Sequence, residues 1–152
     1  MTKPLVNLNA IEIGEDGYAV VSDPLGARRL GYNVSALAPG ASGAPYHNHH
    51  VNEEMFLILA GEGELRFGER TFPVRPLDII ACPPGGREVA HALTNTGNTE
   101  LRYLALSTRD PHDVCEFPDT DQVGVYVGTY GAMKLRHWFR VDQASGPPWE
   151  SA

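Results

Sequence analysis

The chain has 152 residues, of which 42% are hydrophobic and 20% charged, a balance typical of a globular domain and not of a disordered segment. Its formal net charge is −7, and because an acidic protein repels phosphate groups, we expect neither a nucleic-acid nor a membrane partner. No apolar run approaches the roughly 18 residues of a membrane span, and the first residues lack the apolar core of a signal peptide. The two cysteines show no CxxC spacing. We therefore expect a cytoplasmic protein with reduced thiols.

Glycine and proline recur along the whole chain, with 16 and 12 residues respectively, and interrupt every stretch that would otherwise favour a long helix. The segments between them are short and rich in residues that favour strands. In chain order we expect strands at residues 6–13, 18–21, 30–38, 54–60, 63–67, 70–74, 78–82, 91–95, 101–107, 123–127 and 137–141. Many short strands separated by turns predict an all-β sandwich or barrel rather than alternating strands and helices.

No internal repeat and no linker divides the sequence, so we expect a single domain. Within it we expect N-terminal strands over about 5–38, a barrel core over about 40–107 and a C-terminal packing segment over about 110–152. The last segment is rich in turn residues, and a loose tail is the alternative to packing. Three of its aromatic side chains are expected to pack back onto the barrel: Trp138, Phe139 and Trp149.

Candidate metal ligands occur in the segment that precedes and opens the strand at 54–60. His47 and His49 lie two residues apart, so on an extended backbone both imidazole rings leave the same face. Glu54 opens the next apolar run, and a turn between them would bring its carboxylate beside the two rings. Two imidazoles and one carboxylate with open positions are typical of non-haem Fe(II) sites and also suit Mn, Co, Ni, Cu or Zn.

A second segment adds a further candidate ligand, His91, which starts a predicted strand after the turn-rich stretch CPPGGREVA. Glu53 competes with Glu54 as the carboxylate, but the spacing to Gly61 and the shared face with Phe56 favour Glu54. Histidines often lie on a surface without a function, and the chain has six, so the His-x-His pair alone would be weak evidence. The carboxylate and the second histidine make a metal site the better interpretation.

The first of these segments resembles the first motif of the cupin superfamily. That motif contains a glycine, then His-x-His, a glutamate after three or four residues and a glycine after six more. Here residues 47–49 are followed by Glu54 and Gly61, and the opening glycine is Gly40 or Gly43.

The second segment resembles the second cupin motif, which contains Pro-x-Gly, a short gap, a histidine, three residues and an asparagine. Here residues 83–85 read Pro-Pro-Gly, and His91 and Asn95 follow. The gap before His91 is longer than is usual in the family. The two motifs together cover residues 40–95.

The resemblance implies the cupin double-stranded β-helix, an all-β jelly-roll barrel, and a homodimer, since cupins commonly dimerise. It also implies one divalent transition-metal ion, Zn, Fe, Mn, Ni or Cu, with four ligands: His47, His49, Glu54 and His91. The family includes dioxygenases, sugar isomerases or epimerases, decarboxylases and lyases, and a fold alone fixes no chemistry.

Three apolar residues share a strand face with the ligands and are expected to line a small-molecule pocket: Phe56, Ile58 and Leu93. Arg87 is expected at the pocket mouth, with a solvent-exposed ion pair as the alternative. We therefore expect a metal-dependent enzyme, of oxygenase or isomerase type, that acts on a small organic molecule. The alternative is a non-catalytic module that binds or senses a small ligand around a structural metal.

Overall fold

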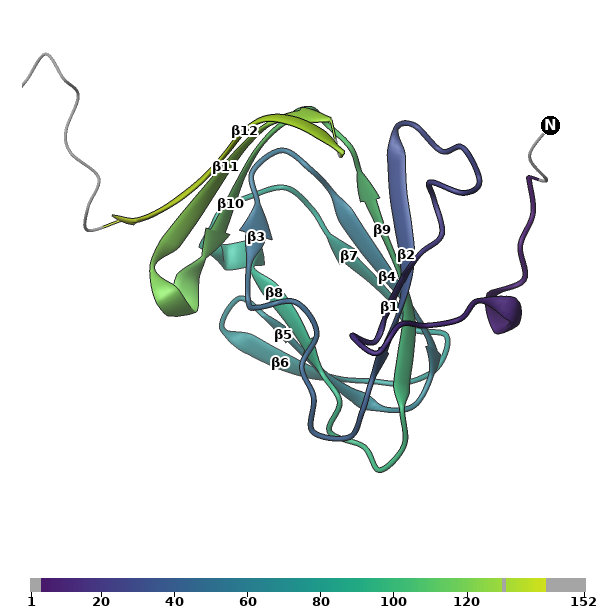
Figure 1. The fold of residues 1–152 in the computed structure, drawn as a ribbon. Coiled ribbons are helices and arrows are strands. Elements are labelled where there is room, and N and C mark those ends of the chain that lie inside the picture. Colours follow the sequence, from purple (N-terminus) through teal and green to yellow (C-terminus); the bar gives the residue numbers. More distant parts are fainter. Residues whose placement is uncertain (1–3, 130, 142–152) are drawn as a thin grey trace, which may run out of the picture.

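The computed structural model describes residues 4–129 and 131–141 (Figure 1). Its strands are β1 (Tyr18–Val20), β2 (Leu30–Leu37), β3 (Asn48–His49), β4 (Glu54–Ala60), β5 (Gly63–Phe67), β6 (Arg70–Val74), β7 (Ile79–Cys82), β8 (His91–Thr94), β9 (Leu101–Thr108), β10 (His112–Phe117), β11 (Gln122–Thr129) and β12 (Ala132–Arg140). The described helical segments are short 3-10 turns: η1 (Leu8–Ala10), η2 (Arg87–Val89) and η3 (Pro118–Thr120). Over the described residues there is no helix of the length and apolar character that crossing a membrane requires.

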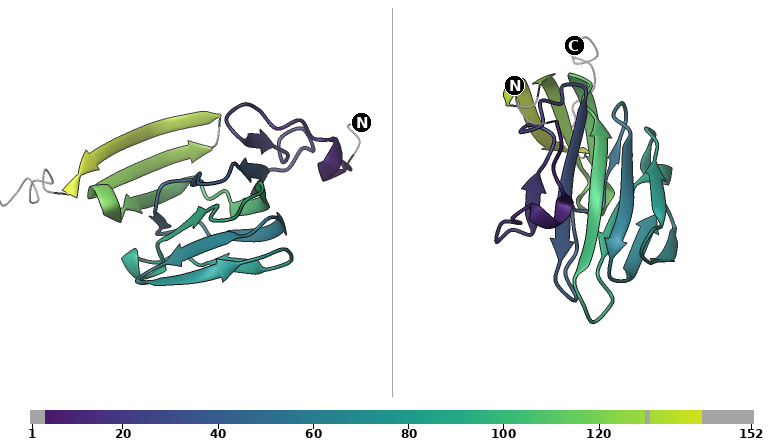
Figure 2. Two further views of the ribbon diagram at one scale, coloured as in Figure 1. Left: turned by 90° about the horizontal axis from the view of Figure 1, so that it is seen from below. Right: turned by 90° about the vertical axis from the view of Figure 1, so that its right-hand side faces the viewer.

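The strands pair antiparallel in three sheets, in the orders β1-β2-β9-β4-β7, β12-β11-β10-β3 and β6-β5-β8. An isolated bridge joins the second sheet to the third, because the amides of His47 and His91 each donate to the other's carbonyl, at 3.2 and 2.8 Å. In Figure 1 the three sheets surround a common interior, and in the left view of Figure 2 β12 forms the outer edge of the four-stranded sheet. The fold is the all-β jelly-roll barrel that was expected.

The interior is filled by the side chains that alternate along each strand. On β4, Phe56 and Ile58 are 8% and 0% exposed, and Glu54 shares their face because side chains two residues apart leave a strand on the same side. The intervening side chains of β4 are only partly buried on the outer face. The core cluster comprises Leu37, Phe56, Ile58, Leu65, Val74, Ile80, Cys82, Leu93, Leu101, Tyr103 and Ala105.

The strand predicted at residues 6–13 is wrong. This segment contains η1, and the side chain of Asn7 accepts a hydrogen bond of 2.9 Å from the amide of Asn9 at the start of the turn. A local bond from side chain to backbone gives the chain an alternative to strand pairing, which the apolar alternation of the sequence does not reveal.

The C-terminal segment differs from the expectation as well. It forms β10, β11 and β12, which pair with one another and, through β10, with β3. No strand was predicted at β10, and β12 begins earlier than predicted, at Ala132. Trp138 and Phe139 remain 46% and 40% exposed, so β12 is added at a sheet edge without burying them, and Trp149 lies outside the described residues.

Candidate metal centre

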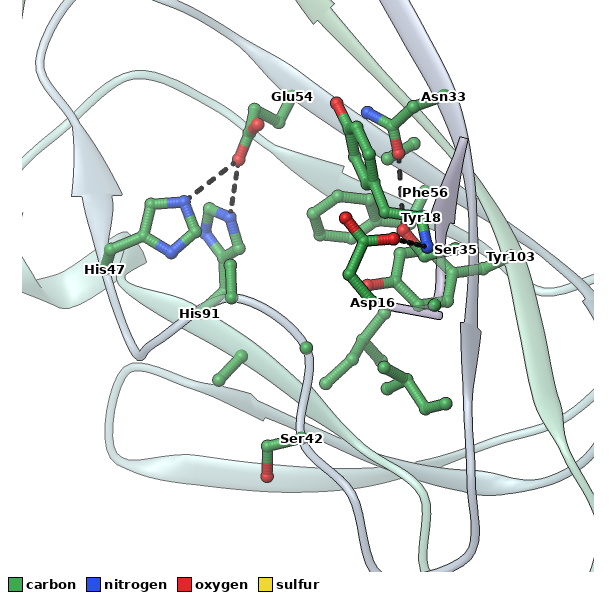
Figure 3. A pocket seen from close by; sticks show the side chains of 17 residues that line it. Asp16, Tyr18, Asn33, Ser35, Ser42, His47, Glu54, Phe56, His91 and Tyr103 are labelled. Atoms are coloured by element: carbon green, nitrogen blue, oxygen red, sulfur yellow. Dashed lines mark hydrogen bonds and ion pairs between the residues drawn. The ribbon is translucent and has the colours of Figure 1, made fainter. Parts of the chain in front are cut away.

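The four predicted ligands come from three sheets and lie together. His47 and His49 flank Asn48 at β3, Glu54 is the first residue of β4, and His91 is the first residue of β8. Figure 3 shows the rings of His47 and His91 directed at the carboxylate of Glu54. His47 and His91 are 8% and 2% exposed, so the group is largely shielded from water.

One carboxylate oxygen, Oε2 of Glu54, lies close to all three rings. It is 3.0 Å from Nε2 of His91, 3.3 Å from Nε2 of His47 and 3.7 Å from Nε2 of His49. The ligand atoms of His47, His49 and Glu54 all lie within 4.8 Å of one another. Two donors that bind one ion at about 2.1 Å are roughly 3.0–3.4 Å apart. The distances from Glu54 to His91 and His47 therefore suit a shared ion, and the distance to His49 is slightly longer. That all four side chains bind one ion remains a prediction.

The remaining nitrogens of two of these rings are already hydrogen-bonded to the backbone. Nδ1 of His47 lies 2.7 Å from the carbonyl oxygen of Pro45, and Nδ1 of His91 lies 3.1 Å from that of Val89. A carbonyl only accepts, so the proton of each neutral ring is on Nδ1 and the lone pair of Nε2 faces Glu54. A lone pair and a carboxylate repel at such distances unless a cation or additional protons lie between them. The donor set thus fits a divalent transition-metal ion.

A carboxylate that the sequence did not reveal holds the third ring. Oδ2 of Asp113, on β10, lies 2.6 Å from Nδ1 of His49 and accepts a bond of 2.8 Å from the side-chain amide of Asn52. Asp113 is 6% exposed. Burial raises the pKa of Asp113, but the hydrogen bonds from His49 and Asn52 outweigh burial, and the pKa is lowered. Asp113 is therefore ionised and orients His49, although 64 residues separate the two in the chain.

The electrostatic balance at the centre favours a positive charge. Burial raises the pKa of Glu54, but without an ion, protons on Nε2 of His47 and His91 that hydrogen-bond to the carboxylate outweigh burial, and the pKa of Glu54 is lowered. Burial lowers the pKa of His49, but the bond to Asp113 and the nearby carboxylate charges outweigh it, and the pKa of His49 is raised. The raised pKa of His49 means that the neighbouring carboxylates favour a positive charge there, and the lowered pKa of Glu54 means that this carboxylate stays ionised and can bind a cation.

The centre opens into a cavity of about 400 Å³, within the range of small-molecule sites. Phe56 and Leu93 line this cavity next to the ligands. Ile58 does not line it, because this residue lies two positions further along β4, at 0% exposure in the core. The alternation of side chains along β4 correctly predicts which residues point inward, but it does not predict how far along the strand the cavity extends.

Arg87 also lies away from the cavity it was expected to border. Its Nε is 3.0 Å from an oxygen of Glu116 and its Nη1 is 3.3 Å from an oxygen of Asp121. These partners lie on and beyond β10, so Arg87 links η2 to the C-terminal strands. The side chain is 47% exposed, which agrees with the alternative of a solvent-exposed ion pair.

The end of the cavity opposite Glu54 is polar (Figure 3). It is lined by Asp16, Tyr18, Asn33, Ser35 and Tyr103, from β1, β2, β9 and the segment before β1. The sequence analysis did not select these residues for a site, because they form no local motif. They meet only because β2 pairs with both β1 and β9.

Comparison with known proteins points to one protein family. A family model described as a cupin domain matches residues 33–107. An uncharacterised protein of Methanocaldococcus jannaschii is 33% identical over 74 residues, or 49% of this chain and 57% of that protein. The oxalate-binding protein of Thermotoga maritima is 34% identical over 70 residues, or 46% of this chain and 54% of that protein. The chain thus spans about half the length of these curated relatives.

A similar solved structure is that of a sugar phosphate isomerase of the cupin superfamily from Silicibacter pomeroyi. It is 23% identical, with a TM-score of 0.77 and coverage of 95% of this chain and 98% of that chain. At this level of identity the likeness shows the fold alone. The segment that matches the family model contains all four predicted ligands and both motifs from His47 to Asn95. The chain therefore belongs to the cupin superfamily.

Proposed function

We propose that the chain is a metal-dependent enzyme that isomerises a small hydroxy-carbonyl compound. The observation that carries this proposal is the position of the candidate metal group. Its His47, Glu54 and His91 line one end of a cavity whose opposite wall is polar. A metal ion held only for stability needs no such opening, because structural sites are usually closed by their protein ligands.

A bound divalent ion supplies a Lewis acid that polarises a carbonyl group. The side chains around it orient the substrate and exclude water. Phe56 packs against the ring of His91, with centroids 5.5 Å apart, and covers that side of the centre. Burial raises the pKa of Tyr103, so its hydroxyl keeps its proton and can donate a hydrogen bond to a substrate oxygen.

The metal-binding group alone suits oxygenases and isomerases equally. The far wall favours an isomerase, because Asn33, Ser35 and Tyr103 offer hydrogen bonds to hydroxyl groups that an isomerisation retains. The fold likeness to a sugar phosphate isomerase supports the same choice.

A second candidate is a non-catalytic module that binds a small ligand around the metal. The similarity to the oxalate-binding protein of Thermotoga maritima favours it. Proton NMR of candidate ligands incubated with the protein separates the two candidates. A binding module leaves every ligand unchanged, whereas an isomerase interconverts a hydroxy-aldehyde and a hydroxy-ketone. Oxygen uptake with the same compounds would instead point to the oxygenase branch.

The metal is tested first, on protein purified without a histidine tag. We expect about one equivalent of a divalent transition metal, and much less in Glu54→Ala and His91→Ala. His112→Ala is the matched control, because His112 is 71% exposed on β10 and is not part of the metal group. Less than roughly a tenth of an equivalent in the unaltered protein would contradict the proposal. The homodimer and the cytoplasmic location remain predictions, and light scattering would test the first.

A further inference from the structure

We infer that the cavity selects an uncharged polyhydroxylated compound, a free sugar or a polyol, over its phosphate ester. This inference rests on the function proposed above, since it assumes that the ligand reaches a metal ion at the Glu54 end. It concerns the opposite end, where the lining residues define the chemical class of the substrate.

The cavity has two polar ends separated by one aromatic ring. Phe56 lies between them, with its ring centroid 5.5 Å from that of His91 and 5.7 Å from that of Tyr103. A ligand that reaches from Glu54 to the far wall therefore passes beside Phe56. A carbon chain with a hydroxyl on each carbon suits this path, because its C–H groups pack against the ring while its oxygens reach either end.

The far wall offers neutral groups that both donate and accept hydrogen bonds. Oγ of Ser35 donates a hydrogen bond of 3.3 Å to Oδ1 of Asn33, and Tyr103 lines the same wall, so three neutral polar side chains face the cavity together. A sugar hydroxyl donates one bond and accepts others, and it can bond to such side chains without leaving a buried polar group unpaired.

The charge of the far wall opposes a phosphate group. Asp16 lines this wall, where its Oδ1 accepts a bond of 3.2 Å from the amide of Tyr18, and no Lys or Arg is among the described residues that line the cavity. A carboxylate accepts two hydroxyl protons readily but repels a dianion.

A neighbouring cavity of about 220 Å³, which shares Tyr18 and Asn33 with the first, is lined by a cation, Arg109. Its Nη2 lies 2.6 Å from Oδ1 of Asp23 and 2.8 Å from Oγ of Ser22. A phosphate there would have to compete with Asp23 for the same guanidinium group.

The test is calorimetric titration of the whole chain loaded with Zn²⁺, with metal content measured first. The probes are free pentoses and hexoses, the corresponding polyols, and fructose beside its terminal phosphate ester. We expect at least one free sugar or polyol to bind, and fructose to bind about tenfold or more tightly than its ester.

Variants then locate the binding. Ser35→Ala and Tyr103→Phe should each weaken binding of the free sugar by roughly 3- to 10-fold. Tyr32→Phe is the matched control, because Tyr32 lies on β2 but on the face opposite Ser35 and is not among the residues that line the cavity. Asp16→Asn should reduce the discrimination against the ester, whereas Glu15→Gln, one residue away and outside the lining, should not.

The outcomes separate the two proposals. A chain that takes up no metal overturns the proposed function and, with it, this inference. A chain that takes up metal but binds the ester as tightly as fructose, or binds no sugar and no polyol, overturns only the substrate class. So does unchanged affinity in both Ser35→Ala and Tyr103→Phe. Tight binding of the ester that is lost in Arg109→Ala would place the phosphate in the neighbouring cavity and would also overturn it.

Discussion

Replacing Asp113 by asparagine should weaken metal binding by about 10- to 100-fold, or roughly 1.4–2.8 kcal/mol. The magnitude follows from the contact of 2.6 Å between Oδ2 of Asp113 and Nδ1 of His49, a short bond that is charge-assisted when the carboxylate is ionised. In Asp113→Asn the neutral amide makes Nε2 of His49 a weaker donor to the metal. Its NH₂ group can also face the ring and favour the wrong tautomer.

Competition between the protein and a chelating dye for Zn²⁺ measures this effect. Asn52→Ala is the informative control, since Asn52 also bonds Asp113, at 2.8 Å, but is not among the candidate metal ligands. Asp119→Asn, at a 54% exposed ion pair with Arg66, controls for the loss of an acidic charge elsewhere. If Asp113→Asn keeps the affinity of the unaltered chain, or if Asn52→Ala loses as much, the role assigned to the carboxylate is wrong.

Three further predictions concern stability. Ile58→Ala should lower the free energy of unfolding by about 2–5 kcal/mol in urea, because Ile58 is fully buried in the core, whereas Ile79→Ala, at 70% exposure, should change it by less than about 0.5 kcal/mol. Burial raises the pKa of Glu116, but its bonds with Arg87 and His50 leave the pKa lowered. This carboxylate therefore stabilises the fold above the ordinary glutamate pKa of about 4.3, and the excess stability over Glu116→Gln should vanish as the pH falls through the lowered value. Zn²⁺ at about 100 times its Kd should stabilise the chain by about 2.7 kcal/mol, and a chelator should reverse this in thermal melts.

The sequence was informative about the metal group because its spacing is local. The two-residue period of a strand was enough to predict that the rings of His47 and His49 lie on one face, and a single turn was enough to bring Glu54 beside them. His91 was found because a motif of turn residues precedes it. None of these inferences required knowledge of which strands pair.

The parts that the sequence missed depend on pairing between distant strands. Asp113 reaches His49 because Cys115 on β10 is in register with His49 on β3, and no local pattern encodes that register. The partners of Arg87 on and after β10 were hidden for the same reason. Asn33 and Ser35 enter the cavity because β2 lies between β1 and β9, a fact of sheet order and not of composition.

The origin of the ligands in three sheets explains why such a group can serve a reaction. His49 belongs to the four-stranded sheet, Glu54 to the five-stranded sheet and His91 to the three-stranded sheet. Each ligand is fixed by backbone pairing that is complete without an ion, so the side chains are held in place before binding and little conformational entropy is lost when the ion binds. The same arrangement gathers the carboxylates of Glu54 and Asp113 around the imidazole rings, and hydrogen bonds lower both pKa values, so both groups are ionised. A preformed centre with two ionised carboxylates thus favours a divalent ion for electrostatic reasons, and one side of it faces the cavity, as the proposed function requires.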